Sequence, residues 1–169
     1  NDNPLPIGEI GQICAKGPQI MKGYWNKREE SEKALKGGWM HTGDAGRMDE
    51  EGFVFIQDRI KDMIVSGGEN IYSTEVEAAL FAHPDVVDAA VIGVPDEKYG
   101  EVVKACIVKK EGSNLTEDDL ISFCKDRIAS YKKPQSVDFI DEVPRNASGK
   151  VLKKVLREPY WKDQERQVS

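Results

Sequence analysis

The chain has 169 residues and a formal net charge of −6, with 39% hydrophobic and 32% charged residues. This composition is typical of a globular protein, and the acidic balance argues against a general nucleic-acid binder. The chain has no run of the roughly 20 apolar residues that a membrane helix needs, and no apolar signal region at its N-terminus. We therefore expect a cytoplasmic protein without a transmembrane segment.

The cysteines and histidines are too few and too scattered for a metal site. Cys14, Cys106 and Cys124 show no CxxC spacing, and the only histidines are His41 and His83. We expect the cysteines to be buried thiols and the chain to bind no metal of its own.

The first 58 residues are predicted to form a β-rich subdomain. Residues 7–16 have the composition of a strand, and a charged surface helix capped by Asn26 should follow over 27–35. A second strand then runs into Asp44, and a turn leads to the apolar strand 53–56, which is typical of a β-hairpin.

Asp44 stands between glycines at the end of its predicted strand, in the sequence Thr42-Gly43-Asp44. Such an aspartate can simply form an Asx turn. Alternatively, its carboxylate can accept two hydrogen bonds from the vicinal hydroxyls of a nucleotide ribose. The residues alone leave both interpretations open.

The stretch from Asp58 to Glu77 combines charges with a glycine turn. Arg59 and Lys61 are two positions apart, so on an extended segment they would point to the same side. The paired glycines 67–68 allow positive φ and close approach of another molecule to the backbone. Two cations beside such a turn suit an anionic ligand, although an exposed hairpin with solvated charges fits the same residues.

The remaining chain is predicted to be a compact α+β unit. Thr74 and Glu77 have the spacing of a capping box at the start of a helix, as do Thr116 and Asp119. The expected elements alternate between helices and apolar strands: helix 74–81, strand 86–94, strand 102–109, helix 117–129, strand 136–140 and helix 151–158. The fold class is therefore α+β, and the boundary falls near residues 58–62.

Lys150 closes the loop Pro144-Arg145-Asn146-Ala147-Ser148-Gly149-Lys150 just before the last predicted helix. Backbone N–H groups at a helix start favour anions, and a lysine adds a mobile positive charge. A surface lysine after a turn is the alternative. The phosphate-loop pattern GxxxxGK[ST] is absent.

Five stretches, in this order, together resemble the adenylate-forming superfamily of acyl-CoA synthetases, luciferases and peptide-synthetase adenylation domains: GEIGQICAKGPQIMKGYWN, GWMHTGDAG, DRIKDMIVSGGENIYSTEVE, VPDEKYGE and PRNASGK. Within this superfamily, the motif sequences are most similar to those of medium- and long-chain fatty acyl-CoA synthetases and of relatives that act on aromatic acids.

The resemblance implies three parts. Residues 1–58 would end a large N-terminal domain as a small β-barrel-like subdomain, 59–62 would be a hinge, and 63–169 would be a mobile C-terminal domain. The family's phosphate loop and acyl pocket would lie in a large N-terminal part outside this sequence, where any peripheral membrane contact would also arise. The chain alone is therefore expected to be inactive.

The resemblance also implies cofactor-binding roles for six residues: Asp44, Arg59, Gly67, Gly68, Glu69 and Asn70. Asp44 would hold the ribose hydroxyls of ATP, and Arg59 would make a second ribose or phosphate contact. The glycine turn with Glu69 would line the pantetheine tunnel, and Asn70 would reach the adenylate. Lys61 would occupy the hinge position.

Lys150 would be the catalytic lysine that contacts the carboxylate and α-phosphate during adenylation. The basic residues around it (Lys153, Lys154 and Arg157) would add a field that attracts coenzyme A phosphates.

The implied function is that of an AMP-forming acid–CoA ligase of fatty acid and lipid metabolism. A fatty or aromatic acid and ATP, accompanied by Mg²⁺, would give an acyl-adenylate, and coenzyme A would then give the thioester. Two alternatives stay open: an adenylating enzyme with a carrier-protein acceptor, and a truncated, non-catalytic interaction module.

Overall fold

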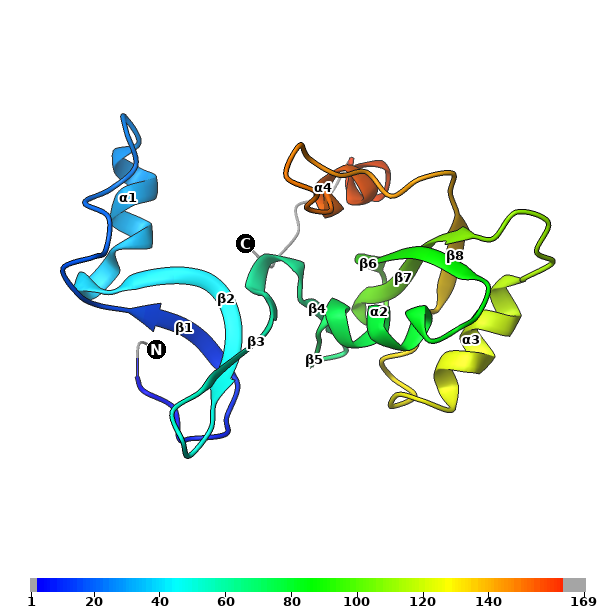
Figure 1. The fold of residues 1–169 in the computed structure, drawn as a ribbon, viewed down its shortest axis with the longest axis horizontal. Helices are drawn as coiled ribbons and strands as arrows, with labels where there is room; N and C mark the ends of the chain where they lie inside the picture. Colours follow the sequence, from blue (N-terminus) through cyan, green and yellow to red (C-terminus); the bar gives the residue numbers. More distant parts are fainter. Residues whose placement is uncertain (1–2, 163–169) are drawn as a thin grey trace. The chain divides into compact units, whose positions relative to one another are not determined.

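The computed structural model describes residues 3–162 and divides the chain into two compact units, Asn1–Lys61 and Asp62–Ser169. Figure 1 traces the helices and strands of both units along the chain. The architecture is mixed α+β, as expected from the sequence, and its sheets are largely antiparallel.

The first unit is built on an antiparallel sheet in the order β1-β2-β3. Its strands are β1 (Gly11–Ala15), β2 (Met40–Met48) and β3 (Val54–Arg59). The sheet is open, since β1 and β3 do not pair with each other within the described residues. The hairpin between β2 and β3 is confirmed, and its turn is closed by Asp49, whose Oδ1 accepts hydrogen bonds from the backbone N–H groups of Glu51 and Phe53.

This sheet buries little apolar surface within the described residues. Ala45 is fully packed, whereas Phe53, Phe55 and Ile56 in and beside β3 are 63%, 46% and 68% exposed. Successive apolar side chains of β3 are therefore exposed on both faces of the strand. An exposed apolar surface of this kind is typical of a contact surface.

The surface helix is present as α1 (Arg28–Ala34), and none of its residues is buried. The expected cap at Asn26 is wrong, because Lys27 occupies the N-cap position and Asn26 has a positive φ of 53°. Ser31 instead fixes the entry to the helix: its hydroxyl accepts a hydrogen bond from the Tyr24 N–H at 2.8 Å and donates one to the Lys27 carbonyl at 2.6 Å.

The second unit contains a five-stranded sheet in which β7 (Gly100–Lys109) is central. Its long antiparallel partner is β6 (Val86–Asp96). On the other edge of β7, β4 (Ile64–Ser66) pairs near Gly100 and carries β5 (Glu69–Ile71), while β8 (Ser136–Phe139) runs parallel to β7.

Both faces of the β6–β7 hairpin are apolar, because alternate residues of a strand point to opposite faces. On one face Val91, Val103 and Ala105 pack against α2 (Ser73–Phe81) and α3 (Glu117–Lys125). On the other face Ile92 and Cys106 belong to a second core cluster. That cluster is covered by Ile140, which follows β8, and by Leu156 and Tyr160 of the segment around α4 (Lys153–Arg157).

The two predicted capping boxes have different outcomes. At α3 the box is confirmed: the Thr116 hydroxyl accepts from the Asp119 N–H, and the Asp119 carboxylate accepts from the Thr116 N–H. At α2 it is wrong, since the N-cap is Tyr72 without a side-chain hydrogen bond, and Glu77 makes long-range contacts instead. The α2 helix also begins one residue before its predicted range, and α3 ends at Lys125, before the predicted end at residue 129.

Neighbouring residues of α2 provide a test of this packing. Leu80 is fully buried in the first core cluster, whereas Phe81 is 49% exposed. Leu80→Ala should lower the free energy of unfolding by about 2–5 kcal/mol, because it leaves a cavity. Phe81→Ala should change it by about 0.5 kcal/mol, as for a surface position. Urea unfolding followed by circular dichroism measures both, and equal losses would contradict this assignment of the core.

Candidate functional site

In the first unit the structure joins two of the predicted site residues, Asp44 and Arg59. They face each other as register partners on β2 and β3, and the Arg59 Nε lies 2.8 Å from the Asp44 Oδ1. Both side chains reach solvent, with 27% of Asp44 and 46% of Arg59 exposed. The pair therefore presents a carboxylate and a guanidinium side by side on the surface of this unit.

The backbone around Asp44 is held by Thr42. The Thr42 hydroxyl donates to the Ile13 carbonyl at 2.9 Å on β1 and accepts from the Asp44 N–H at 3.1 Å. Gly43 between them has a φ of 77°, which side chains rarely tolerate. The Thr-Gly-Asp sequence thus forms a local turn within β2 that fixes where the carboxylate leaves the strand.

Lys61 lies in a 3₁₀ turn, Ile60–Asp62, at the end of the first unit. The expectation that Arg59 and Lys61 share one side of an extended segment is therefore wrong, because the chain leaves the extended conformation after Arg59. Lys61 stands at the boundary between the two units.

The glycine turn is a two-residue hairpin loop between β4 and β5. Gly67 and Gly68 have φ values of 58° and 88°, as the tight turns that join antiparallel strands require. The Gly67 N–H donates to the Tyr99 carbonyl at 2.8 Å, and a Cβ at Gly67 would come within 3.2 Å of the Tyr99 ring. Glu69 and Asn70 open β5 as exposed residues.

Lys150 is exposed at the end of a closed loop that the side chain of Asn146 organises. The Asn146 Oδ1 accepts hydrogen bonds from the N–H groups of Ser148 and Lys150 at 3.0 and 2.9 Å, and the Asn146 N–H donates to the Lys150 carbonyl at 2.9 Å. Lys150 does not stand at a helix start, because α4 begins only at Lys153 and has a single turn. The predicted contribution of helix N–H groups to an anion site is therefore wrong.

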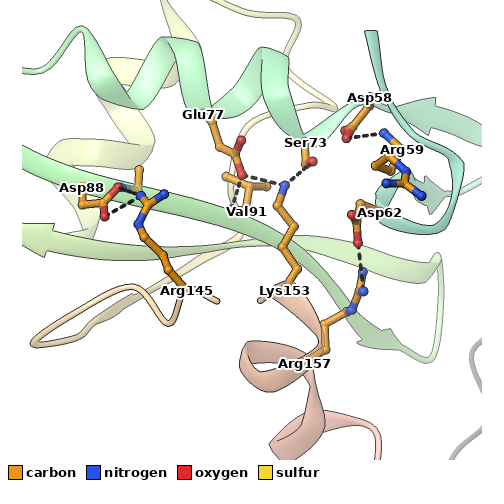
Figure 2. Close-up of polar contacts among 11 residues, drawn as sticks. Asp58, Arg59, Asp62, Ser73, Glu77, Asp88, Val91, Arg145, Lys153 and Arg157 are labelled. Carbon is orange, nitrogen blue, oxygen red and sulfur yellow. Dashed lines mark hydrogen bonds and ion pairs between the residues drawn. The ribbon is translucent and has the colours of Figure 1, made fainter. Parts of the chain in front are cut away.

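The segment that follows Lys150 lies across the second face of the β6–β7 hairpin and is held there by polar contacts. Lys153 pairs with Glu77 of α2 at 2.7 Å, and Arg157 pairs with Asp62 at 2.9 Å; all four side chains are 11–17% exposed. Figure 2 shows both pairs together with the link between Arg145 and Asp88.

These ion pairs correct the expected role of the basic residues. Lys153 and Arg157 point into the second unit and are engaged by carboxylates, whereas Lys154 is exposed. The prediction that these basic residues present their charges to coenzyme A is therefore wrong for Lys153 and Arg157.

A further polar cluster joins the end of this segment to the sheet. Asp138 of β8 accepts hydrogen bonds from Lys104 at 2.7 Å and from the Tyr160 hydroxyl. Partial burial would raise the pKa of Asp138, but the hydrogen bonds from Lys104 and Tyr160 outweigh it and hold that pKa below its usual value. Burial, followed by the nearby Asp138, raises the pKa of Tyr160.

The three cysteines, which all lie within residues 3–162, form no disulfide, and two of the three are buried as expected. Cys106 and Cys124 lie in the two core clusters, whereas Cys14 is only half-buried on β1. Burial raises the pKa of the Cys106 thiol to about 11, so it is uncharged at neutral pH.

Residues 3–162 contain no cluster of three or more His, Cys, Asp or Glu side chains that could hold a metal ion. Within the same range, every helix is too short or too polar to traverse a lipid bilayer.

Residues 75–150 match the family model of the AMP-binding enzyme C-terminal domain. Over 157 residues, the chain is 47% identical to feruloyl-CoA synthase from an Amycolatopsis species, covering 93% of this chain and 32% of that protein. The chain belongs to the adenylate-forming superfamily. Over 165 residues it is also 46% identical to the fatty acid–[acyl-carrier-protein] ligase ScoC from Streptomyces coeruleorubidus, covering 98% of this chain and 32% of that protein.

Comparison with solved structures supports the same superfamily. The ATP-bound crystal structure of MatB from Rhodopseudomonas palustris superposes with a TM-score of 0.87 at 43% identity, covering 92% of this chain and 31% of that chain. The chain thus spans about a third of the length of the relatives that it matches.

The residues that sequence reasoning missed are those that hold the Lys150 loop and the segment after it. Asp88, Asp62 and Glu77 each pair with a basic residue 57 or more positions away. Spacing along the chain carries no signal for such contacts. Asp88, a charged residue within the apolar run Val86–Val94 of β6, was an available hint.

The Asp138 cluster predicts a pH dependence of stability. A carboxylate with a lowered folded-state pKa stabilises the fold above its unfolded pKa of about 3.9. That contribution is lost as the pH falls through the still lower folded-state value. Asp138→Asn should therefore destabilise the protein at pH 7, and the difference from the parent should shrink toward pH 3. Urea unfolding between these pH values measures it; a difference that does not change with pH would contradict the prediction.

Proposed function

We propose that the chain is the C-terminal third of an ATP-dependent, AMP-forming acid–CoA ligase. The observation that carries this proposal is the match of residues 75–150 to the AMP-binding enzyme C-terminal domain. That match ends on Lys150, the exposed cation that a closed and anchored loop presents to solvent. The similarity to a CoA ligase over almost the whole chain supports the same function.

In the first half-reaction, a carboxylate oxygen of the acid forms a bond to the α-phosphorus of ATP. The bond to the bridging oxygen breaks, and pyrophosphate leaves. Two anions must approach each other, so a positive charge between them stabilises the transition state more than the separated reactants. Lys150 supplies this charge in our proposal. Asp44 accepts hydrogen bonds from the ribose hydroxyls, and Arg59 orients that carboxylate and contacts ribose or phosphate.

In the second half-reaction, the sulfur of coenzyme A attacks the acyl carbonyl, the thiol proton is released, and AMP leaves. This step needs an open channel for the pantetheine arm. The β4–β5 hairpin is suited to line such a channel, because Gly68 leaves the backbone open to close approach and Glu69 and Asn70 are exposed beside it. Lys61 serves as the hinge between the two units in this scheme, and such domain motions fall in the μs–ms range.

Mg²⁺ enters this reaction as part of the substrate, bound to the phosphates of ATP. ATP binding is supported by the ATP-bound relative MatB, to which the chain is 43% identical. The residues that would meet the nucleotide, Asp44 and Arg59, offer hydrogen-bonding and phosphate-pairing groups, which are suited to ATP.

The relatives support a fatty or aromatic acid as the substrate, since one is a feruloyl-CoA synthase and another acts on a fatty acid. A second candidate acceptor is a carrier protein, because ScoC is an acyl-carrier-protein ligase at almost the same identity. Inactivity of the isolated chain, a cytoplasmic location and peripheral membrane contact through other parts of the protein stay predictions.

Lys150→Ala in the full-length enzyme tests the proposed catalytic role. Loss of one charge-stabilising contact typically costs about 10²- to 10³-fold in rate. Acid-dependent ATP–pyrophosphate exchange should fall by about that factor. Thioester formation from pre-formed acyl-adenylate and coenzyme A should stay near the parent rate, and a panel of fatty and aromatic acids identifies the substrate.

Lys154→Ala is the matched control, because Lys154 is an exposed lysine in the same segment. It should leave ATP–pyrophosphate exchange, in which coenzyme A takes no part, unchanged. If the parent enzyme shows no exchange with any acid, the ligase proposal fails and the interaction module becomes the better account. If carrier-protein phosphopantetheine replaces coenzyme A in the second assay, the carrier-protein alternative holds.

Asp44→Asn tests the proposed ribose contact. A hydrogen bond to a charged group contributes about 1.5–3 kcal/mol, so the KM for ATP in the exchange assay should rise at least about tenfold. The KM for the acid should change little, because Asp44 would contact only the nucleotide. An unchanged KM for ATP would leave Asp44 with only the structural role of pairing with Arg59.

A further inference from the structure

The loop that ends on Lys150 is anchored near its own N-terminal end and again shortly after Lys150. On the N-terminal side, the Arg145 Nη2 donates to both carboxylate oxygens of Asp88 on β6, at 2.9 and 2.8 Å. The Arg145 Nη1 donates to the Gly149 carbonyl at 3.0 Å, so the same guanidinium also closes the loop. Figure 2 shows this guanidinium lying against Asp88.

On the C-terminal side, the anchor is Lys153, three residues after Lys150. Its ammonium lies 2.7 Å from the Glu77 Oε1 and donates to the Ser73 hydroxyl, both on α2. Glu77 in turn accepts a hydrogen bond from the Val91 N–H of β6 at 2.9 Å. One carboxylate therefore connects the Lys150 segment, the helix and the sheet (Figure 2).

The chain between the two anchors has little slack. Val151 forms a β-bridge with Arg145, and the Leu152 N–H donates to the Pro144 carbonyl at 2.8 Å. Since the loop closes on itself and its ends are fixed, a change at Lys153 shifts the base from which the Lys150 side chain extends.

We propose that Glu77, with Lys153, is a positioning residue for Lys150 in the adenylation half-reaction. This inference rests on the proposed function. A largely buried ion pair is a weak source of net stability, because desolvation offsets much of the attraction. It does, however, have a strict geometry: the Glu77 oxygen that meets Lys153 also accepts the Val91 N–H. That shared acceptor fixes the lysine relative to the sheet.

The same contact connects the two proposed faces of this lobe. The α2 helix begins at Ser73, two residues after β5 ends, so Ser73 and Glu77 follow directly on the Gly67–Gly68 hairpin. Lys153 follows directly on the Lys150 loop. The Lys153–Glu77 contact therefore holds the Lys150 loop to the helix that follows the Gly67–Gly68 hairpin.

Two carboxylates of α2 allow a matched test. Glu77 pairs with Lys153 at 2.7 Å, and Glu75 pairs with Lys132 at 2.7 Å, away from the Lys150 segment. In the full-length enzyme, Glu77→Gln and Lys153→Met should each lower ATP–pyrophosphate exchange by about tenfold to a hundredfold, since misplacement of a reacting group by about 1 Å costs up to 10²-fold. The controls Glu75→Gln and Lys132→Met should leave exchange unchanged.

Thioester formation from pre-formed acyl-adenylate distinguishes positioning from a structural role. Each Glu77 or Lys153 variant should keep the parent rate in that assay, because Lys150 does not act in it. Equal losses in both half-reactions, or equal losses in the Glu75 and Glu77 variants, would overturn the proposal. Asp88→Asn, at the more exposed anchor, gives a second test if Glu77→Gln does not fold, and it should produce the same selective loss.

A double-mutant cycle with Lys150→Ala separates this inference from the proposed function. Residues that act through one group are non-additive. Glu77→Gln should therefore lower exchange no further once Lys150 is alanine. A full additional loss in that background overturns the positioning role. If Lys150→Ala alone leaves exchange unchanged, the proposed role of Lys150 fails instead, whatever Glu77→Gln does.

Discussion

The burial of both faces of the β6–β7 hairpin is the constraint on which the second unit depends. Residues at odd positions, such as Val91 and Val103, pack under α2 and α3, while those at even positions, such as Ile92 and Cys106, need a separate cover. The segment after β8 supplies that cover with Leu156 and Tyr160. Burying these side chains contributes roughly 25 cal/mol per Å² of apolar surface, so the path of the Lys150 segment across the sheet follows from packing.

Apolar contacts place this segment, but they do not fix it at atomic precision. A leucine can shift along an apolar surface at little cost, whereas a carboxylate that accepts from both an ammonium and a backbone N–H cannot. Lys153 and Arg157 meet Glu77 and Asp62 in positions where each charge is nearly hidden from water. Removing one partner of such a pair is strongly unfavourable, which restricts the segment to one register.

The sequence was sufficient for the elements and for the superfamily. Alternating apolar residues predicted β6 and β7 and the spacing of Thr116 and Asp119 predicted the cap of α3, because both signals are local. The five motifs carried the resemblance for the same reason. The three strands predicted for the first unit are present, and they form an open sheet beside which Phe53 is exposed.

The site was less predictable, because its architecture depends on contacts between distant residues. Glu77 was assigned to a capping box on spacing, and tertiary contacts with Lys153 and Val91 override that local role. The 3₁₀ turn at Lys61 was read as extended, since three residues are too few to show a period. The predicted roles of Asp44 and Lys150 came from resemblance, and their functions stay proposals.

A single framework for both faces bears on how a two-step ligase of the proposed kind avoids interference between its steps. The cation that promotes adenylation must leave the reaction centre before a thiolate can use the same space. On a flexible loop, the cation would vacate that space only part of the time. Lys153 is held by Glu77 and Arg145 is held by Asp88, and these contacts restrain the Lys150 loop against independent motion of that kind. Withdrawal of Lys150 then requires movement of the whole lobe. The same movement carries the Gly67–Gly68 hairpin, so one event ends the first step and prepares the second.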